Sequence, residues 1–377
     1  MKNIAIVGAG ISGLYLANLL QNDSNYNFTI YEKRSSLDIN DGYGIQLSAN
    51  SIKLLNEIGF KNIPAHEVSF PKKVNFYEAK TGIKICDIDI SKFNNQNARY
   101  TTLKRSTLIK FLLGNIPADR IISNCELTNI EYPKRIKISF SNNFTEEFDY
   151  LIVSDGVFSK TKSIILQKYS SPRFFNSVAL RGNIKNIQNN DISLYLGSNF
   201  HFVIYPVNQN DEFNFITIIR KKLSKSEFSD VNLFRNNDFL QSLCKVIYQK
   251  TSLDLNGKIE NIKSFPIYVS EKLEIPHKKN VYFVGDALFA LPPSFAQGAS
   301  QSIEASKDLY EEINNNTNTY YKKRIKKLNA VNWRSKLNHF AFHLSSPLTI
   351  FFRNIILKSL IRNNKFLEHY LGKIYRN

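Results

Sequence analysis

A glycine-rich turn between a predicted strand and a predicted helix restricts the fold of this chain more than any other feature. The apolar run Ile4–Val7 is followed by Gly8, Gly10 and Gly13, and then by an apolar helical pattern over Leu14–Leu20. In a β-α-β unit the first glycine permits a tight turn, the second lets the backbone approach a pyrophosphate, and the third lets the helix pack on the strand. The helix N-terminus carries free N–H groups that favour phosphate. This order predicts a dinucleotide-binding unit.

An acidic residue follows the second predicted strand, at the position where a dinucleotide-binding unit uses a carboxylate. The second predicted strand, Phe28–Tyr31, ends at Glu32, which lies 32 − 13 = 19 residues after Gly13. A carboxylate there accepts hydrogen bonds from the ribose hydroxyls of an adenosine. The alternative is a glycine-rich turn with an unrelated surface glutamate. The motif is shared by NAD and FAD sites and does not separate them.

The chain beyond this unit alternates between strand-rich and helical patterns. A helix is predicted over 105–113, and helical patterns dominate from Gly298 onward. Alternating or apolar runs predict strands within 73–90 (two strands with a turn at Thr81 and Gly82), 121–131, 135–140, 148–153, 178–184, 192–196, 200–205, 213–219 and 281–284. The strand-rich blocks therefore interrupt the nucleotide-binding unit, and the two parts of the protein are interleaved along the chain.

A segment far from the N-terminus makes the nucleotide more specific. Val281–Ala287 carries a Gly-Asp pair and is followed by two prolines ending at Pro293, then Gln297–Ala299 and Ile303–Ala305. This order resembles the FAD-dependent aromatic hydroxylases, the group A flavoprotein monooxygenases that include 4-hydroxybenzoate, salicylate and 3-hydroxybenzoate hydroxylases. The resemblance implies that Asp286 binds the ribityl chain of FAD. It also implies that the helix starting near Gly298 and Ala299 points its N-terminus at the flavin N1–C2=O edge, where its dipole favours the anionic reduced form.

Further segments resemble the same family in the same order, from Lys2 to about Ala305 and more faintly to Tyr375. Gly42–Leu47 resembles the loop along the cofactor, Lys104–Leu108 the start of a helix whose arginine contacts FAD, and Val153–Ser159 a segment linked to FAD and NAD(P)H. The cofactor-binding residues implied by these matches are Gly8, Gly10, Ser12, Gly13, Glu32, Lys33, Gly44, Arg105, Asp155, Asp286, Gly298 and Ala299. Leu180–Gly182 and His201–Val207 resemble strands of the substrate domain, with Arg181 and Pro293 as substrate-binding candidates.

The resemblance also sets the expected architecture. We expect an α/β fold, α+β overall, in which a Rossmann-type FAD-binding domain is interleaved with a mainly antiparallel β-sheet substrate domain and followed by a helical C-terminus. The expected FAD-binding domain comprises 1–70, 98–170 and 273–325. The substrate domain comprises 71–97 and 171–272, and the helical segment 326–377.

The activity that the resemblance implies is a monooxygenase reaction. FAD is held tightly but non-covalently, NADH or NADPH reduces it, and the reduced flavin combines with O2 to give a flavin hydroperoxide. The hydroperoxide transfers one oxygen atom to a phenolic or quinone-precursor ring. Two alternatives stay open: an FAD-dependent reductase or epoxidase acting on a prenyl or other lipid substrate, and a flavin-binding protein without turnover.

The chain departs from the family pattern near the expected flavin ring. The family commonly has a histidine three residues after the alanine that follows Gly-Asp, where this chain has Ala290, and a glycine after the two prolines, where it has Ser294. These departures bear on the substrate more than on the cofactor. The tryptophan motif of flavin halogenases is absent, since the only tryptophan is Trp333.

Two catalytic candidates follow from the chemistry of ring hydroxylation. A deprotonated phenol reacts faster with an electrophilic oxygen, so a base near neutral pH is useful, and histidine suits that role. Of the six histidines, only His201 falls in a strand expected to face the substrate, and Tyr205 points to the same side of that strand. The pair resembles the histidine and tyrosine that contact the phenol in hydroxybenzoate 6-hydroxylase-like members. The alternative is a histidine at a sheet edge and a tyrosine packed in the core.

The net charge and the cysteine content limit the classes of partner and metal site that the chain can have. The net charge of +18 fits nucleic acid, an anionic membrane, a negatively charged substrate or merely a lysine-rich solvated surface. No zinc-ligand spacing, repeat or basic tail supports nucleic-acid binding. Three cysteines without a CxxC pair indicate neither a disulfide framework nor a metal site. No signal-peptide order and no apolar run of ~18 residues is present, so a cytoplasmic protein is expected.

The stretch Pro347–Arg362 is apolar with interspersed basic residues, which is a pattern of helices that lie on an anionic membrane. Ser346 could cap this helix and Pro347 suits its first position. Projected at about 100° per residue, however, the apolar positions surround the helix instead of forming one face. That distribution favours burial against the rest of the protein over peripheral contact with the inner face of a membrane.

Overall fold

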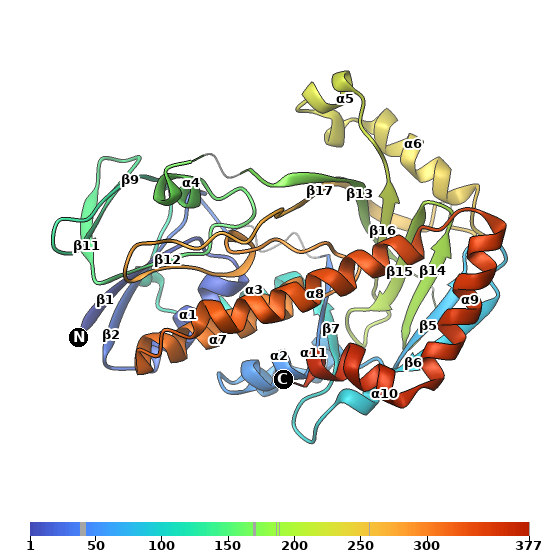
Figure 1. Cartoon of the computed structure of the whole chain (residues 1–377), viewed down its shortest axis with the longest axis horizontal. Coiled ribbons are helices and arrows are strands. Elements are labelled where there is room, and N and C mark those ends of the chain that lie inside the picture. Colours follow the sequence, from blue (N-terminus) through green and yellow to red (C-terminus); the bar gives the residue numbers. More distant parts are fainter. Residues whose placement is uncertain (38–42, 169–170, 186, 188, 256, 377) are drawn as a thin grey trace.

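The computed structural model describes residues 1–37, 43–168, 171–185, 187, 189–255 and 257–376. Gly42, which belongs to the predicted cofactor loop, lies outside these residues. Figure 1 shows the described chain, with a nucleotide-binding half beside a large curved sheet, the long helix of residues 320–342 running from one to the other, and the last helices beside the sheet.

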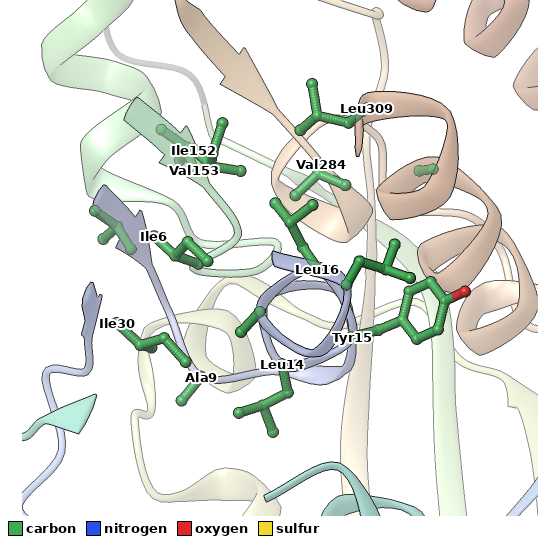
Figure 2. Close-up of a cluster of buried hydrophobic side chains, with 14 of the residues drawn as sticks. Ile6, Ala9, Leu14, Tyr15, Leu16, Ile30, Ile152, Val153, Val284 and Leu309 are labelled. Atoms are coloured by element: carbon green, nitrogen blue, oxygen red, sulfur yellow. The ribbon is translucent and has the colours of Figure 1, made fainter. Parts of the chain in front are cut away.

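A parallel sheet of five strands forms the nucleotide-binding half, in the order β18-β12-β1-β2-β8. Its strands are β1 (Lys2–Val7), β2 (Tyr26–Tyr31), β8 (Ile121–Ile122), β12 (Tyr150–Val153) and β18 (Val281–Phe283). The inner strands are apolar and almost continuously buried because helices cover the sheet. Helix α1 (Ile11–Gln21) packs between this sheet and α7 (Gly298–Asn315). Figure 2 shows Leu16 of α1 directed toward Val284 and Leu309, while Leu14 leaves the other side of the helix.

The second half is built on a seven-stranded sheet in the order β17-β13-β16-β15-β14-β5-β6. Its neighbouring strands are antiparallel, except that β14 and β5 run parallel. The strands are β5 (Lys73–Glu78), β6 (Lys84–Asp89), β13 (Arg173–Ile184), β14 (Ile192–Gly197), β15 (Phe200–Pro206), β16 (Phe213–Arg220) and β17 (Ile259–Val269). Arg181 pairs with Ile216, and Ile216 with Val203, so these three side chains lie on one face of the sheet.

Two three-stranded sheets and the remaining helices complete the fold. The first small sheet comprises β9 (Leu127–Glu131), β10 (Ile136–Phe140) and β11 (Thr145–Phe148), and the second β3 (Gly44–Leu47), β4 (Val68–Ser69) and β7 (Thr101–Lys104). The other α-helices are α2 (Ala49–Asn56), α3 (Arg105–Gly114), α4 (Lys160–Leu166), α5 (Lys225–Ser229), α6 (Asn237–Tyr248), α8 (Tyr320–Phe342), α9 (Pro347–Arg362), α10 (Asn364–Leu367) and α11 (Lys373–Tyr375). A π-helical turn, Glu368–Gly372, joins α10 to α11.

The predicted fold class is confirmed: a Rossmann-type parallel sheet, a largely antiparallel sheet and a helical C-terminus are all present. The division into domains stays a prediction. The strand β17 and the helices α5 and α6 were not predicted. The run 121–131 forms two short strands in different sheets, β8 and β9, instead of one.

The interpretation of 347–362 as a helix buried by the rest of the protein is wrong. The helix α9 does begin at Pro347, and the Ser346 hydroxyl accepts a hydrogen bond from the Thr349 N–H. Only one side of it packs inward, where Leu357 and Ile361 contact the cluster around β5 and β6. Its outer side exposes large apolar side chains, between 48% and 67% of each: Leu348, Phe351, Phe352, Ile355 and Ile356. No helix within the described ranges is both long and apolar enough to cross a bilayer.

Candidate active site

The glycine turn after β1 combines two crowded positions with one open position. Gly8 has φ +103°, and a Cβ there would lie 2.7 Å from the Cα of Asp155. A Cβ on Gly13 would lie 2.6 Å from Ser154 Oγ and overlap the Gly8 carbonyl oxygen. At Gly10 the nearest atom to an added Cβ is the Ser154 carbonyl oxygen at 3.9 Å. Gly8 and Gly13 are therefore required for packing, whereas Gly10 leaves space beside the N-terminus of α1.

Beside this turn, Glu32 and Asp155 present carboxylates to a small cavity that Lys33 also lines. Glu32 is fixed by its own backbone contacts: Oε2 accepts from Ala9 N at 3.0 Å and Oε1 from Arg34 N at 3.1 Å. Asp155 Oδ1 is buried with no hydrogen-bond partner among the described residues, and burial raises the pKa of this carboxyl above its usual range. These acceptors suit the hydroxyls of a bound nucleotide.

A second set of polar groups lies about the start of α7. Gly285 has φ +64°, and a Cβ there would lie 2.6 Å from Ser12 Oγ, so this turn packs directly on α1. The next residue, Asp286, is an exposed residue that lines a large cavity, and desolvation by the surrounding protein raises the pKa of its carboxyl to about 6. Gln297 precedes α7 without capping it, and its Nε2 is buried with no hydrogen-bond partner in the described part of the chain. Gly298 and Ala299, at the first turn of α7, line the same cavity.

Gly44 is held against the substrate-side sheet. Its N–H donates to Asn214 Oδ1 at 2.7 Å, and a Cβ on it would lie 2.8 Å from Tyr205 Cε2. It pairs with Lys104 in the β3–β7 ladder, and Arg105 follows at the start of α3. The structure brings Gly44 to the wall of the large cavity, but Arg105 does not line either cavity.

These features fit FAD as the group held here. The N-termini of α1 and α7 have neither a side-chain cap nor an acidic residue in the first turn, so their N–H groups are available to anionic oxygens. Asp286 and the partnerless Gln297 Nε2 supply an acceptor and a donor at the α7 end. The open position at Gly10 leaves room for a pyrophosphate between the two ends.

The large cavity has a volume of about 740 Å³ and runs from Asp286 and α7 to the C-terminal helices. One face of the seven-stranded sheet forms one wall, with apolar side chains from four strands: Val74, Phe76, Ile192, Leu194, Val203, Ile216 and Ile218. The loop 291–297 and the helices α8 and α9 contribute to the opposite side. The cavity is therefore an apolar chamber that adjoins the proposed flavin end.

Three predicted residues place polar groups in this apolar wall. Arg181 lies with its guanidinium carbon 6.0 Å from the centre of the Tyr43 ring, has no ion-pair partner among the described residues, and has its pKa lowered by burial. Burial also raises the pKa of the Tyr205 hydroxyl. His201 and Tyr205 both line the cavity, yet they leave β15 four residues apart, about 13 Å along the strand. A single small ring cannot contact both. Pro293 lies in the loop that faces them.

His201 belongs to a cluster of three histidines that the sequence interpretation missed. His201 Nδ1 lies 2.8 Å from His343 Nε2, and the His339 and His343 rings are 4.1 Å apart at their centres. Burial lowers the pKa of His201 to about 3 and that of His339 to about 4, and lowers the pKa of His343 as well. His339 lies in the last turn of α8 and His343, four residues later, caps the end of that helix, so the two side chains leave the same side. The spacing of four residues between these two histidines is the sequence feature that could have indicated the cluster.

Comparisons with known proteins agree with this arrangement. Residues 6–39 match the family model described as an NAD(P)-binding Rossmann-like domain. The chain is 22% identical over 314 residues to 6-hydroxynicotinate 3-monooxygenase of Bordetella bronchiseptica, covering 80% of each chain. It is also 22% identical to salicylate hydroxylase of Pseudomonas putida, over 80% of this chain and 74% of that protein.

Solved structures give the same fold. HpxO of Klebsiella pneumoniae, crystallised with FAD and uric acid, superimposes with a TM-score of 0.83 at 16% identity, over 98% of this chain and 97% of that chain. The predicted resemblance to the FAD-dependent aromatic hydroxylases is confirmed by these relatives. The roles of individual residues stay predictions.

Replacement of Asp286 by alanine should weaken FAD retention without destabilising the apoprotein. The carboxylate has no ion-pair partner among the described residues, so its removal leaves nothing unpaired in the fold. A lost hydrogen bond to a charged group corresponds to about 1.5–3 kcal/mol, or roughly a tenfold to hundredfold weaker affinity. FAD content after gel filtration and the melting temperature of the apoprotein measure the two quantities. Asp119→Ala, at an exposed aspartate, is the control. Full FAD retention in Asp286→Ala would remove this residue from the cofactor site.

Proposed function

We propose that this chain, whose relatives are FAD-dependent aromatic-ring monooxygenases, uses FAD, NADH or NADPH, and O2 to hydroxylate an electron-rich aromatic ring. The observation that carries the proposal is the continuity of one cavity. Asp286 and the N-terminus of α7 line the same space as the apolar face of the seven-stranded sheet. A ring bound against that face would therefore lie beside a flavin bound at α7. We propose the cytoplasm as its location, where NADH and NADPH are available.

The cofactor, once reduced, supplies the electrons that activate O2, and the protein supplies position, charge and exclusion of water. The apolar walls keep water from the reacting ring. The N-terminus of α7 supplies partial positive charge at the flavin end of the cavity. We propose that the residues named above, from Gly8 to Ala299, hold the cofactor, with Gly8 and Gly13 shaping the turn and Gly10 admitting the pyrophosphate.

We propose that Arg181 and Tyr205 act at the flavin end of the substrate chamber. Arg181 is a cation without an ion-pair partner among the described residues, in an apolar wall, so it would stabilise a phenolate or carboxylate on the ring. The Tyr205 ring packs against Gly44, and burial keeps its hydroxyl protonated. Pro293 would contact the ring from the facing loop.

His201 is proposed as a residue that contacts a substituent of the ring further along the chamber and so helps to hold the ring in place. Its lowered pKa makes it a weak base, so it would accept or donate a hydrogen bond as neutral imidazole and would not remove a phenol proton at neutral pH. Its Nε2 has no hydrogen-bond partner within the described residues, while Nδ1 meets His343. This orientation leaves one ring nitrogen for a ligand.

A screen of aromatic compounds tests the proposed function. The protein with FAD bound is mixed with NADH or NADPH and each compound, and flavin reduction, O2 uptake and product mass are followed. We expect at least one ring that speeds flavin reduction and yields a product with one added oxygen atom. A product that gains hydrogen would identify a reductase. Absence of NADH and NADPH consumption with every ring would favour a flavin-binding protein without turnover.

The change His201→Ala should slow hydroxylation and raise the fraction of O2 released as peroxide, while FAD content stays normal. The reason is that a ring held less firmly reacts less often with the activated oxygen. The effect should be about the same from pH 6 to pH 8, because the imidazole is neutral across this range. Peroxide yield per NAD(P)H consumed is the measurement. Unchanged coupling would exclude His201 from the reaction, and Tyr205→Phe should give a milder defect.

A further inference from the structure

Large apolar side chains are exposed on both α8 and α9, the two helices that follow one another at residues 343–346. On α8, Trp333, Leu337 and Phe340 recur at helical spacing and are 60%, 40% and 60% exposed. Leu337 and Phe340 border the same cavity as Phe352 and Ile356 of the exposed apolar side of α9 described above. We call these residues together the α8–α9 face. In Figure 1 the two helices meet at the outer end of the large sheet, away from the nucleotide-binding half. Monomeric soluble proteins rarely expose so many large apolar side chains in one place.

The positive charge of the chain is concentrated on the same helices. Residues 320–367 contain eleven lysines and arginines and no aspartate or glutamate, so they supply 11 − 0 = 11 of the net +18. Near the α8–α9 face, Lys336, Lys358, Arg362 and Lys365 are exposed, and none has an ion-pair partner among the described residues. An apolar surface bordered by unpaired cations has the composition that binds anionic lipid.

The substrate chamber reaches this face. Leu337, Phe340, Phe352 and Ile356 are each at least 40% exposed, and all four also line the large cavity. The same side chains therefore border both the cavity and the outer apolar surface. A molecule entering between α8 and α9 would pass a predominantly apolar lining, in which Asn338, Thr349 and Arg353 are the polar residues of these helices, before it reached Arg181 and Asp286 at the inner end.

We infer that the α8–α9 face docks on an anionic lipid bilayer and that the substrate enters the cavity from that bilayer. Burial of the exposed aromatic and aliphatic side chains in the interfacial region provides the apolar contribution, and the cations provide attraction to anionic headgroups. Self-association through the same face would bring the four unpaired cations near the face of one copy toward those of a second copy, which electrostatic repulsion opposes.

The inference also names a class of substrate, and that part of it rests on the proposed function. A ring that carries an aliphatic chain would place the ring near Arg181 and the chain along the apolar walls toward the α8–α9 face. A small polar ring near Arg181 would leave the apolar walls between the sheet and the α8–α9 face without a partner. The class that fits is therefore a lipid-soluble aromatic compound.

Binding to vesicles tests the docking directly, and the tryptophan of the chain serves as a fluorescent probe. Trp333 is the only tryptophan and lies within the face. The protein with FAD bound is mixed with vesicles of phosphatidylcholine alone or with phosphatidylglycerol added. We expect co-sedimentation, a blue shift of Trp333 emission and quenching by brominated lipid with the anionic vesicles only. Binding that is equal for both vesicles, or no binding, would overturn the inference.

Matched pairs of variants distinguish binding through the α8–α9 face from nonspecific adsorption of exposed apolar side chains to lipid. Phe351→Gln with Ile355→Gln removes two exposed side chains that do not line the cavity, whereas Phe228→Gln with Val231→Gln does the same on and beside α5. The first pair should abolish sedimentation and the second should not change it. Lys358→Gln with Arg362→Gln should weaken it about twenty-five-fold, at roughly fivefold per charge, whereas Lys222→Gln with Lys250→Gln should have little effect. A first pair that binds vesicles normally, or that converts a dimer to a monomer in light scattering, would overturn the inference.

Substrate entry is tested without turnover, so its outcome is independent of the proposed reaction. A series of 4-alkylphenols is titrated while the absorption spectrum of the bound flavin is followed. Each added methylene should tighten binding about fourfold until the chain fills the chamber. An affinity that does not change with chain length would exclude the lipid-soluble class, even where the protein oxidises NADH or NADPH with a small phenol.

Discussion

A valine in place of Gly10 should leave the protein folded and abolish FAD retention. Gly10 has φ −85° and ψ −177°, which any residue adopts, and an added Cβ would find its nearest atom 3.9 Å away. The side chain would instead occupy the space through which a pyrophosphate approaches the N-terminus of α1. Loss of charge-assisted hydrogen bonds of about 3 kcal/mol corresponds to at least a hundredfold weaker binding. Flavin content after gel filtration and the melting temperature of the apoprotein are the measurements.

Substitutions at two other glycines serve as comparisons for Gly10→Val. Gly13→Ala should destabilise the apoprotein itself, because its Cβ would meet Ser154 Oγ and the Gly8 carbonyl oxygen. Gly114→Val, at the exposed end of α3 where nothing lies within 4 Å, should change neither quantity. A Gly10→Val protein that purifies with a full complement of FAD would show that the pyrophosphate does not pass this position.

Acidification from pH 6.5 to pH 4 should destabilise the protein through the buried histidines. Their pKa values are lower in the folded protein, about 3 for His201 and about 4 for His339, than the ordinary 6.5 of an unfolded histidine. The unfolded chain therefore binds protons first, and this part of the stability is complete above pH 6.5 and lost as the pH falls toward 4. The loss is on the order of 3 kcal/mol for each histidine as an upper bound. Asp286 acts in the opposite direction, because its pKa is raised to about 6 in the folded protein.

Urea unfolding at pH 7.5 and pH 5 measures this effect, and a variant isolates it from the carboxylates. His343→Gln removes one buried imidazole while keeping an amide within reach of His201, so its stability should depend less steeply on pH than that of the wild type. His66→Gln, at an exposed histidine, should follow the wild-type curve. Parallel curves for wild type and His343→Gln would show that this cluster takes up protons in the folded state.

The parts of the fold that short-range patterns specify could be predicted from the sequence. The β1–turn–α1 unit is one example, because strand, glycines, helix and Glu32 all lie within a few dozen residues. The edge strand β17 was missed because Pro266 interrupts it, and because its ladder with β13 contains irregularities. A proline is tolerated at an edge, where one side of the strand pairs with nothing.

In the candidate active site, too, only what short-range patterns specify could be predicted from the sequence. Strand alternation predicts that His201 and Tyr205 point to the same side of β15, and both line the cavity, but alternation does not take account of their separation along the strand. The contact between His201 and His343 joins residues 142 positions apart, which no local pattern reveals. For α9, a helix apolar on all sides gives no indication of which side meets solvent, so its exposure became apparent only in the structure.

The wide spacing of the segments that form the cofactor site has a kinetic consequence. Ser154 Oγ donates to the carbonyls of Val7 and Gly8 across 147 and 146 residues, and Gly285 packs on Ser12 from still further along the chain. Closing such long loops costs entropy before the contacts form, so this junction is expected to assemble late in folding. A ligand that binds only the completed junction cannot guide the chain toward it. FAD would instead lengthen the lifetime of molecules that have already folded, by slowing the step in which the segments separate.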